Sequence, residues 1–212
     1  IVRGTVTLTI DASDPAGVSS IAVTAPDGTA LLRDVNKSST SHYVGYWDTT
    51  SAGDGPLTFN ITAADGLGNV QHGVFSVVVD NTAPSITDSS PPPVSAFATS
   101  IPIASLASDL NAIASFSLTG LAGFADTDTA VDRLSGTWTI PQAVSDGPVT
   151  YTLTACDVVG NCASAIRTAR VDRTAPTVTL QPTPSPTSST SVPLSFTATD
   201  PGGIGVGHVY VQ

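Results

Sequence analysis

Short runs of alternating apolar and polar residues, separated by turn residues, extend along most of the chain. In the first run, Val6, Leu8 and Ile10 alternate with threonines. Residues 57–62 alternate Leu, Phe and Ile with Thr and Asn, and residues 149–154 alternate Val, Tyr and Leu with Thr. A period of two sends successive side chains to opposite faces of a strand. Each run therefore predicts a β-strand with one buried face.

Blocks of this pattern recur at a spacing of about 92 residues. The sequence Val-Asp-Asn-Thr-Ala-Pro at 79–84 returns as Val-Asp-Arg-Thr-Ala-Pro at 171–176, and Asp-Gly-Pro at 54–56 returns at 146–148. A further block occurs three times, at residues 5–23, 100–118 and 191–211. Recurrence at a fixed period is typical of chains built from repeated units.

Several short strands in about 92 residues, each with one buried face, predict an all-β fold of two-sheet sandwiches. We place the unit boundaries at the two Thr-Ala-Pro stretches, because proline ends a strand's hydrogen-bond ladder and stiffens the connection. The predicted units are residues 1–80, in which the first strand is missing, 81–173, which is complete, and 174–212, which holds N-terminal strands only. The proline-rich stretches 91–93 and 182–186 are interpreted as extended segments at a sheet edge.

A part unit of 39 residues cannot bury a core by itself. Two hypotheses follow. The chain is a slice of a longer array, or it is a whole subunit whose C-terminal part unit pairs with the open first unit of the next copy.

The composition agrees with a β-rich chain, since 30 Thr and 25 Ser are present and strong helix formers are rare. The net charge is −10, with 17 acidic residues, all Asp, against 7 Lys and Arg. So few cations cannot form a phosphate-binding stripe, which excludes nucleic acid as a partner and disfavours an anionic membrane surface. No apolar run approaches the roughly 20 residues of a membrane span.

Three motifs resemble the tandem immunoglobulin-like repeats of bacterial and archaeal surface proteins. They are the Asp-Gly-x-x-Thr-aromatic strand (54–59, 146–151), the Ala-x-Asp-x-x-Gly-Asn hairpin (63–69, 155–161) and the Val-Asp-x-Thr-Ala-Pro junction. The resemblance covers essentially the whole chain. It implies tandem immunoglobulin-like β-sandwiches, one complete and two partial, at an extracellular or cell-surface location.

The function that the resemblance implies is that of a rigid repeat spacer in a surface array, stalk, filament or sheath. The partners would be neighbouring immunoglobulin-like units or copies of itself. The alternatives are an adhesin or carbohydrate-binding module, with surface glycans as partners, and a non-catalytic appendage of a secreted enzyme.

Cys156 and Cys162 flank the turn of the second hairpin motif. Residues that face each other across a hairpin have Cβ atoms about 4.5–5.5 Å apart, which is close to disulfide geometry. Two free thiols, or half of a metal site, are the alternatives. A disulfide predicts an oxidising, extracellular compartment.

Aspartates in the turns are the candidate metal ligands. The immunoglobulin-like fold would bring one set together at the junction between the first two units and begin an equivalent set at the next junction. Ca²⁺ takes six to eight oxygen ligands, so calcium is the cofactor considered, although none is required. Turn capping by each Asp is the alternative, and Arg173 in the place of Asn81 counts against calcium. The candidate ligands are Asp80, Asp109, Asp157, Asp172 and Asp200.

Two glycosylation sequons, Asn-x-Ser/Thr, begin at Asn36 and Asn60. The alternation of its strand predicts that Asn60 points outward, where it could carry a glycan, although such short motifs also occur by chance in a Ser/Thr-rich chain. A second acidic cluster, formed by Asp126, Asp128 and Asp132, is interpreted as a solvated loop rather than a cation site.

Trp47 and Trp138 occupy matching positions in two units and are predicted to lie in the cores. Tyr43 and Tyr46 have no counterparts in the second unit, so we expect them to be local surface features. Only exposed aromatic residues would support the carbohydrate-binding alternative.

Catalysis finds little support in the sequence. The histidines His42, His72 and His208 stand at different positions of the repeat, without a pattern of partner residues. No nucleophile elbow, zinc-protease motif or phosphate loop is present. We therefore predict that the protein is not an enzyme.

Overall fold

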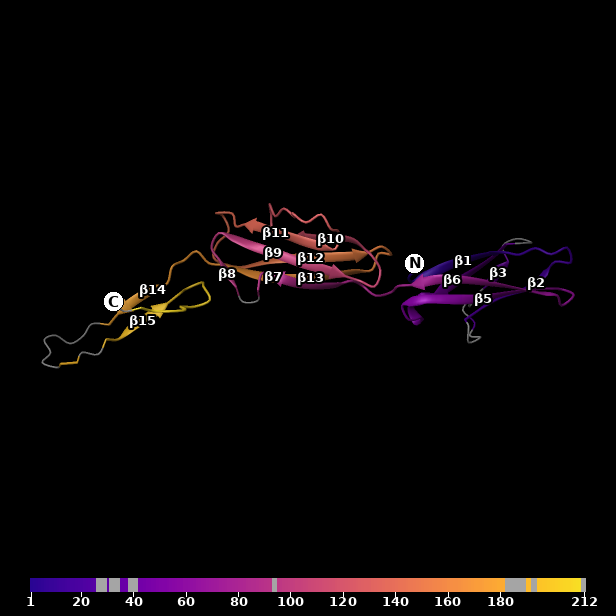
Figure 1. The fold of residues 1–212 in the computed structure, drawn as a ribbon, viewed down its shortest axis with the longest axis horizontal. Coiled ribbons are helices and arrows are strands. Elements are labelled where there is room, and N and C mark those ends of the chain that lie inside the picture. The colour runs from indigo at the N-terminus through magenta and orange to yellow at the C-terminus, as the bar shows by residue number, and fades with distance from the viewer. Residues whose placement is uncertain are drawn as a thin grey trace. The chain divides into compact units, whose positions relative to one another are not determined.

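The structure is a computed structural model. It describes residues 1–25, 30, 35–37, 42–92, 95–181, 190–191 and 194–210, without the side chains of 35–37. The chain divides into two units: unit 1 is Ile1–Ala83 with Val158–Asn161, and unit 2 is Pro84–Asp157 with Cys162–Gln212. Figure 1 shows the ribbon with its strands labelled.

Unit 1 is a sandwich of two three-stranded antiparallel sheets, in the orders β1-β4-β3 and β2-β5-β6. Its strands are β1 (Thr5–Asp11), β2 (Val18–Thr24), β3 (Val35–Lys37), β4 (His42–Asp48), β5 (Gly55–Asp65) and β6 (Val70–Val79), and a 3₁₀ turn η1 (Thr49–Ser51) follows β4. The core contains Val23, Trp47, Phe59 and Val79, all nearly inaccessible to solvent.

The predicted alternation is confirmed in β1. Val6, Leu8 and Ile10 are half-buried and pack against the core of unit 1, whereas the threonines between them are exposed. The β-branched and aromatic residues of these strands suit a pleated surface with one face in the core.

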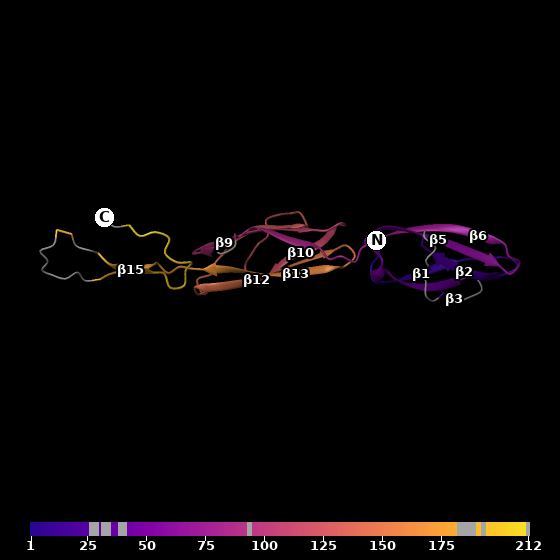
Figure 2. The same cartoon turned by 90° about the horizontal axis from the view of Figure 1, so that it is seen from below.

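Unit 2 contains a larger sandwich with a three-stranded sheet, β11-β9-β7, and a four-stranded sheet, β10-β12-β13-β8. Its strands are β7 (Ser85–Ser90), β8 (Ala96–Phe97), β9 (Ser100–Ser108), β10 (Ile113–Thr119), β11 (Arg133–Thr139), β12 (Gly147–Asp157) and β13 (Cys162–Val171). The two layers separate in Figure 2, which shows β9 in one and β12 in the other. Ile101, Ile103, Trp138, Leu153 and Val171 are among the core residues between them.

The first segment of this sandwich contributes to both sheets. Strand β7 pairs antiparallel with β9, and β8 then pairs parallel with β13 through Phe97 and Val171. Seven strands split three and four, with the first segment shared between the sheets, form an immunoglobulin-like sandwich. The predicted all-β, immunoglobulin-like fold is confirmed. In unit 1, a parallel bridge from Val2 to Val79 is the counterpart of the β8 pairing.

A two-stranded antiparallel sheet follows in unit 2, formed by β14 (Thr177–Leu180) and β15 (Phe196–Thr199). Strand β7 is an edge strand that ends at the cis Ser90–Pro91 bond, as expected of a proline-rich edge. Pro93 and the stretch 182–186 lie outside the described residues. The described part of the chain contains no helix that is both long and apolar enough to cross a membrane.

Candidate functional site

Each sandwich is followed by a segment with the sequence Asp-x-Thr-Ala, at residues 80–83 and 172–175, and a proline comes directly after it. We call these two stretches the exit segments. Both are tied by hydrogen bonds to the sandwich that they leave, although different side chains make the bonds.

Asn81 holds the exit segment of unit 1. Its Oδ1 accepts hydrogen bonds from the backbone N–H of Gly4 (3.1 Å) and from the Thr49 hydroxyl (2.9 Å), and its Nδ2 donates to the Thr49 carbonyl (3.0 Å). Thr49 is completely buried, so the Asn81 amide provides partners for polar atoms that water does not reach.

The Asp54 carboxylate adds a second attachment. Its Oδ1 accepts the backbone N–H of Asn81 (2.8 Å), and its Oδ2 accepts the Thr82 hydroxyl. These bonds favour the ionised form, so the Thr82 hydroxyl, followed by the Asn81 N–H, holds the pKa of Asp54 below its ordinary value.

In unit 2, Arg173 holds the exit segment, as Asn81 does in unit 1. Its guanidinium donates to four carbonyl oxygens, those of Ala98 (3.0 Å), Ile140 (3.2 Å), Pro141 (3.0 Å) and Val144. The planar guanidinium, with five N–H donors, suits several carbonyls that converge from separate loops. Arg173 therefore fastens the second exit segment to loops around β8 and β11.

A carboxylate at the equivalent position, that of Asp146, also binds the exit segment of unit 2. Thr174 donates its hydroxyl to Asp146 Oδ2 (2.6 Å), as Thr82 does to Asp54. The pKa of Asp146 is lowered, chiefly by this hydroxyl, with the Arg173 N–H and its positive charge adding to the effect. The Asp and the Thr are separated by the same number of residues in both units.

Sequence reasoning did not single out these residues. In the sequence, Arg173 stands out only because it replaces Asn81 at the second junction. Asp54 and Asp146 stand out only as parts of a recurring strand motif. The available signal was the joint recurrence of the Asp and the Thr at one fixed separation.

Among the predicted calcium ligands, Asp80 lies in unit 1, where it is 1% exposed and its Oδ1 accepts the backbone N–H of Thr82 (3.3 Å). In unit 2, Asp109 Oδ1 accepts the backbone N–H of Asn111 (2.9 Å), and Asp157 lies buried at the end of β12. Carboxylate oxygens of Asp109 and Asp157 lie within 4.8 Å of each other. The bonds made by Asp80 and Asp109 are those expected of a turn-capping Asp.

Asp172 and Asp200 are brought together in unit 2. A Cβ added at Gly203 would lie 2.0 Å from Asp200 Oδ2 and 2.5 Å from Asp172 Oδ2, so both carboxylates face this glycine. Oδ1 of Asp200 is buried without a hydrogen-bond partner among the described residues, which suits a cation ligand. Two carboxylates are fewer than the six to eight oxygens of calcium, and the assignment stays a prediction.

The predicted disulfide between Cys156 and Cys162 is confirmed, with a Cα–Cα distance of 4.1 Å across the β12–β13 hairpin. The equivalent hairpin of unit 1 has Ala64 and Val70 at the two cysteine positions, and Asp65 caps its turn. There the Asp65 carboxylate accepts the backbone N–H groups of Leu67 and Asn69 (both 2.8 Å) and the Asn69 amide (2.6 Å). These bonds, first among them that of the Asn69 side chain, lower the pKa of Asp65.

The predictions for the aromatic residues are confirmed in part. Trp47 and Trp138 lie in the cores, 4% and 3% exposed, as predicted. Tyr46 is 52% exposed, but the surface prediction for Tyr43 is wrong, because Tyr43 is 6% exposed and donates its hydroxyl to the Val18 carbonyl (3.4 Å). Tyr43 and Trp47 are four residues apart on β4 and therefore share its inward face.

Asn60 is exposed on β5, as predicted, and Asn36 lies on β3 with its side chain outside the described part of the structure. In the second acidic cluster, Asp126 accepts the backbone N–H groups of Asp128 (3.1 Å) and Ser135 (2.9 Å). Asp132 contributes its backbone carbonyl to Ala107 (2.8 Å).

The three histidines lie on different elements. His42 Nδ1 is 2.7 Å from Asp11 Oδ1 at an exposed position, His72 contacts the Thr62 hydroxyl on the β5–β6 face, and the ring of His208 stacks on that of Tyr210.

No protein-family model matches the chain, and no curated protein sequence matches it. Solved structures to which the chain is similar include the extracellular domains EC3–6 of protocadherin gammaB7, with 16% identity over 98% of this chain and a TM-score of 0.39. The chain spans about half (52%) of that structure. Fibronectin(III)-like modules of Clostridium thermocellum CbhA have 14% identity over 79% of this chain and 84% of theirs, with a TM-score of 0.36. The D00–D0 domains of intimin have the same identity, coverage of this chain and TM-score, over 90% of their own length.

Proposed function

We propose that this chain is a structural module of an extracellular surface array, in which its sandwiches act as spacers. The observation that carries the proposal is the pair of exit segments. In both units, the residues that follow the last core strand are fastened to that unit by a carboxylate and by a multiply bonded side chain, Asn81 or Arg173.

The mechanism is mechanical. Thr82 is the last hydrogen-bonded residue of the first exit segment, and only Ala83 separates it from Pro84. Proline fixes its own φ near −65° and restricts the residue before it to extended conformations. Few backbone dihedrals therefore remain free between Thr82 and Pro84, which suits a spacer that carries load along the chain.

The extracellular location rests on the disulfide. Disulfides persist in oxidising compartments and are rare in reducing ones. This bond joins the ends of β12 and β13, where the paired positions of β5 and β6 hold Ala64 and Val70.

The test compares the molecular alignment of the two units in the full chain by residual dipolar couplings. The wild type is expected to give one alignment tensor for both units, and Thr82→Ala, which removes the bond to Asp54, is expected to give two. Thr58→Ala is the matched control, because it removes an exposed hydroxyl bond to Ser76 (2.9 Å) away from the exit segment. Different tensors in the wild type, or one tensor in Thr82→Ala, would contradict the proposal.

A further inference from the structure

The Asn-Ile-Thr sequon at residues 60–62 lies on β5 and takes no part in the spacer function. Asn60 and Thr62 are two positions apart, so their side chains are on the same face of the strand. Phe59, the residue before Asn60, is completely buried on the opposite face, whereas Asn60 is exposed. The two side chains that define the sequon therefore both lie on the outer face of the sheet.

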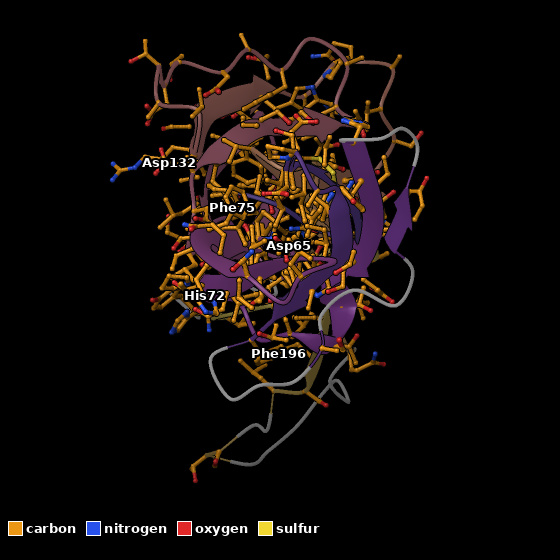
Figure 3. All side chains as sticks on the ribbon, turned by 90° about the vertical axis from the view of Figure 1, so that its right-hand side faces the viewer. Asp65, His72, Phe75, Asp132 and Phe196 are labelled. Carbon is orange, nitrogen blue, oxygen red and sulfur yellow. A yellow bond between two sulfur atoms is a disulfide. The ribbon has the colours of Figure 1, made fainter. Side chains whose placement is uncertain are left out.

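Asn60 occupies the middle of three neighbouring cross-strand pairs on the outer face of β5 and β6. The pairs are Thr58–Ser76, Asn60–Val74 and Thr62–His72. The two hydroxyls of the first pair are 2.9 Å apart. In the third pair, the threonine hydroxyl lies 3.3 Å from Nδ1 of His72, which Figure 3 labels. The middle pair cannot bond in this way, because the valine side chain has neither a donor nor an acceptor.

The side chain of Asn60 has no structural task in the part of the chain that the structure describes. Its amide makes no hydrogen bond there, whereas the amides of Asn69 and Asn81 both donate to oxygen atoms of unit 1. Asparagine is also depleted in strands relative to β-branched residues, and unit 2 has Thr152 at the equivalent position. Asn60 thus provides neither a bond nor strand propensity, and its amide nitrogen is free to react.

The surface around Asn60 is open and carries an exposed apolar side chain. Val74 is 70% exposed, and its place is taken in unit 2 by Ile166, which is 72% exposed. On the other side, the residue of β2 paired with Asn60 is the uncharged Thr24. A sugar attached to the amide would meet no charged residue at these paired positions, and the C–H groups of its ring would cover the valine. The exposed apolar residue is common to both units, but only unit 1 has the acceptor beside it.

We propose that Asn60 is the acceptor of an N-linked glycan whose first sugar ring lies over Val74. The donor is a sugar joined through its anomeric carbon to a phosphate. A bond forms between Asn60 Nδ2 and the anomeric carbon, the bond from that carbon to the phosphate oxygen breaks with its electron pair on the oxygen, and the amide proton is released. Thr62 supplies the hydroxyl that completes the acceptor motif. The proposal goes beyond the spacer function and shares with it only the export of the chain.

The experiment maps the peptide masses of the chain as exported by the cells that produce it. The wild type is expected to carry a whole number of sugar residues on the peptide that contains Asn60. Asn60→Gln and Thr62→Val are each expected to lose this mass. Thr62→Ser keeps the sequon and should retain it. Thr58→Val is the matched control, because it removes the equivalent hydroxyl on the other side of Asn60 and should also retain the glycan.

A second measurement tests where the first sugar lies. The glycosylated chain is expected to melt at a higher temperature than Asn60→Gln, because the sugar removes part of Val74 from water. In a Val74→Ser background, most of this difference is expected to disappear. Val70→Ser is the control, since Val70 is a second exposed valine on the same face of β6, opposite Ala64 rather than Asn60. Fluorescence of Trp47, in the core of unit 1, reports the transition.

Several outcomes overturn the proposal. An unmodified Asn60 in the exported chain does so, and so does a glycan carried by Asn36 alone. Retention of the glycan in Thr62→Val, or its loss in Thr58→Val, would show that the sequon does not specify it. A melting difference that Val74→Ser leaves intact would overturn the placement of the first sugar. Each of these results leaves the spacer proposal standing, because that proposal is tested by the alignment of the two units.

Discussion

Replacing Asn81 with Ala should destabilise unit 1 far more than its position after the last strand suggests. The substitution removes three hydrogen bonds: one donated to the Thr49 carbonyl, one accepted from the Thr49 hydroxyl and one accepted from the Gly4 N–H. A neutral hydrogen bond contributes about 1 kcal/mol, and leaving a buried partner unsatisfied costs at least as much. Because Thr49 is completely buried, we expect a loss of about 3 kcal/mol in the free energy of unfolding of unit 1.

The assay is urea denaturation of the full chain followed by tryptophan fluorescence. The chain has two tryptophans, Trp47 in the core of unit 1 and Trp138 in the core of unit 2. In a Trp138→Phe background, the signal reports on unit 1 alone. With an m-value of about 2 kcal/mol/M, the expected loss lowers the transition midpoint by about 1.5 M urea.

For chains produced without a glycan, Asn60→Ala is the matched control, because it makes the same chemical change at an exposed position on β5. Its effect should stay within about 0.5 kcal/mol. A loss below about 1 kcal/mol for Asn81→Ala would refute the reasoning, since it would mean that the amide bonds do not hold the exit segment to Thr49.

The remaining predictions concern pH, the disulfide and calcium. Three carboxyls have lowered pKa values: Asp54, Asp65 and Asp146. Their stabilisation is therefore complete above the unfolded-state pKa of about 4 and is lost as the pH falls through the lower folded-state values; a melting temperature that stays level from pH 5 to pH 2 would contradict this. Cys156→Ala with Cys162→Val copies the hairpin of unit 1 and should cost unit 2 about 2 kcal/mol, seen in Trp138 emission but not in that of Trp47. Calcium should raise the melting temperature of the wild type but not of Asp200→Asn, with Asp11→Asn as the control; a wild type indifferent to calcium and to chelator would remove the assignment.

The fold could be predicted because it depends on local pattern. The alternation at Val6, Leu8 and Ile10 is set by the period of a strand, and the structure shows that face packed on the core. The same rule would have placed Tyr43 correctly. Tyr43 and Trp47 are four positions apart on one strand, an even number, so both side chains face inward. The absence of a counterpart in unit 2 gives no information about burial.

The exit segments could not be predicted in the same way, because their bonds join residues far apart in the sequence. Arg173 reaches carbonyls at Ala98 and at Ile140, and only the folded sandwich brings these loops together. Comparing the residue identities of the two units hides this shared role. Asn81 and Arg173 differ in size and charge, yet each satisfies the polar backbone atoms beside its exit segment.

Differences between equivalent positions of units 1 and 2 are therefore informative about packing when several neighbouring positions change together. In unit 2, Asp88, Ser105 and Arg167 are polar together, and the Asp88 carboxylate bonds to both of the others. In unit 1 the last two positions hold Ile10 and Phe75, both apolar. A carboxylate buried against Ile10 and Phe75 would be unpaired, which costs several kcal/mol unless the group becomes neutral.

The reverse mismatch is also unfavourable. Leu at the position of Asp88 would remove the carboxylate that now pairs with both the Arg167 guanidinium and the Ser105 hydroxyl. The polar set of unit 2 thus matches the Asp of its own first strand, and a Leu at that position would leave two polar groups without their partner.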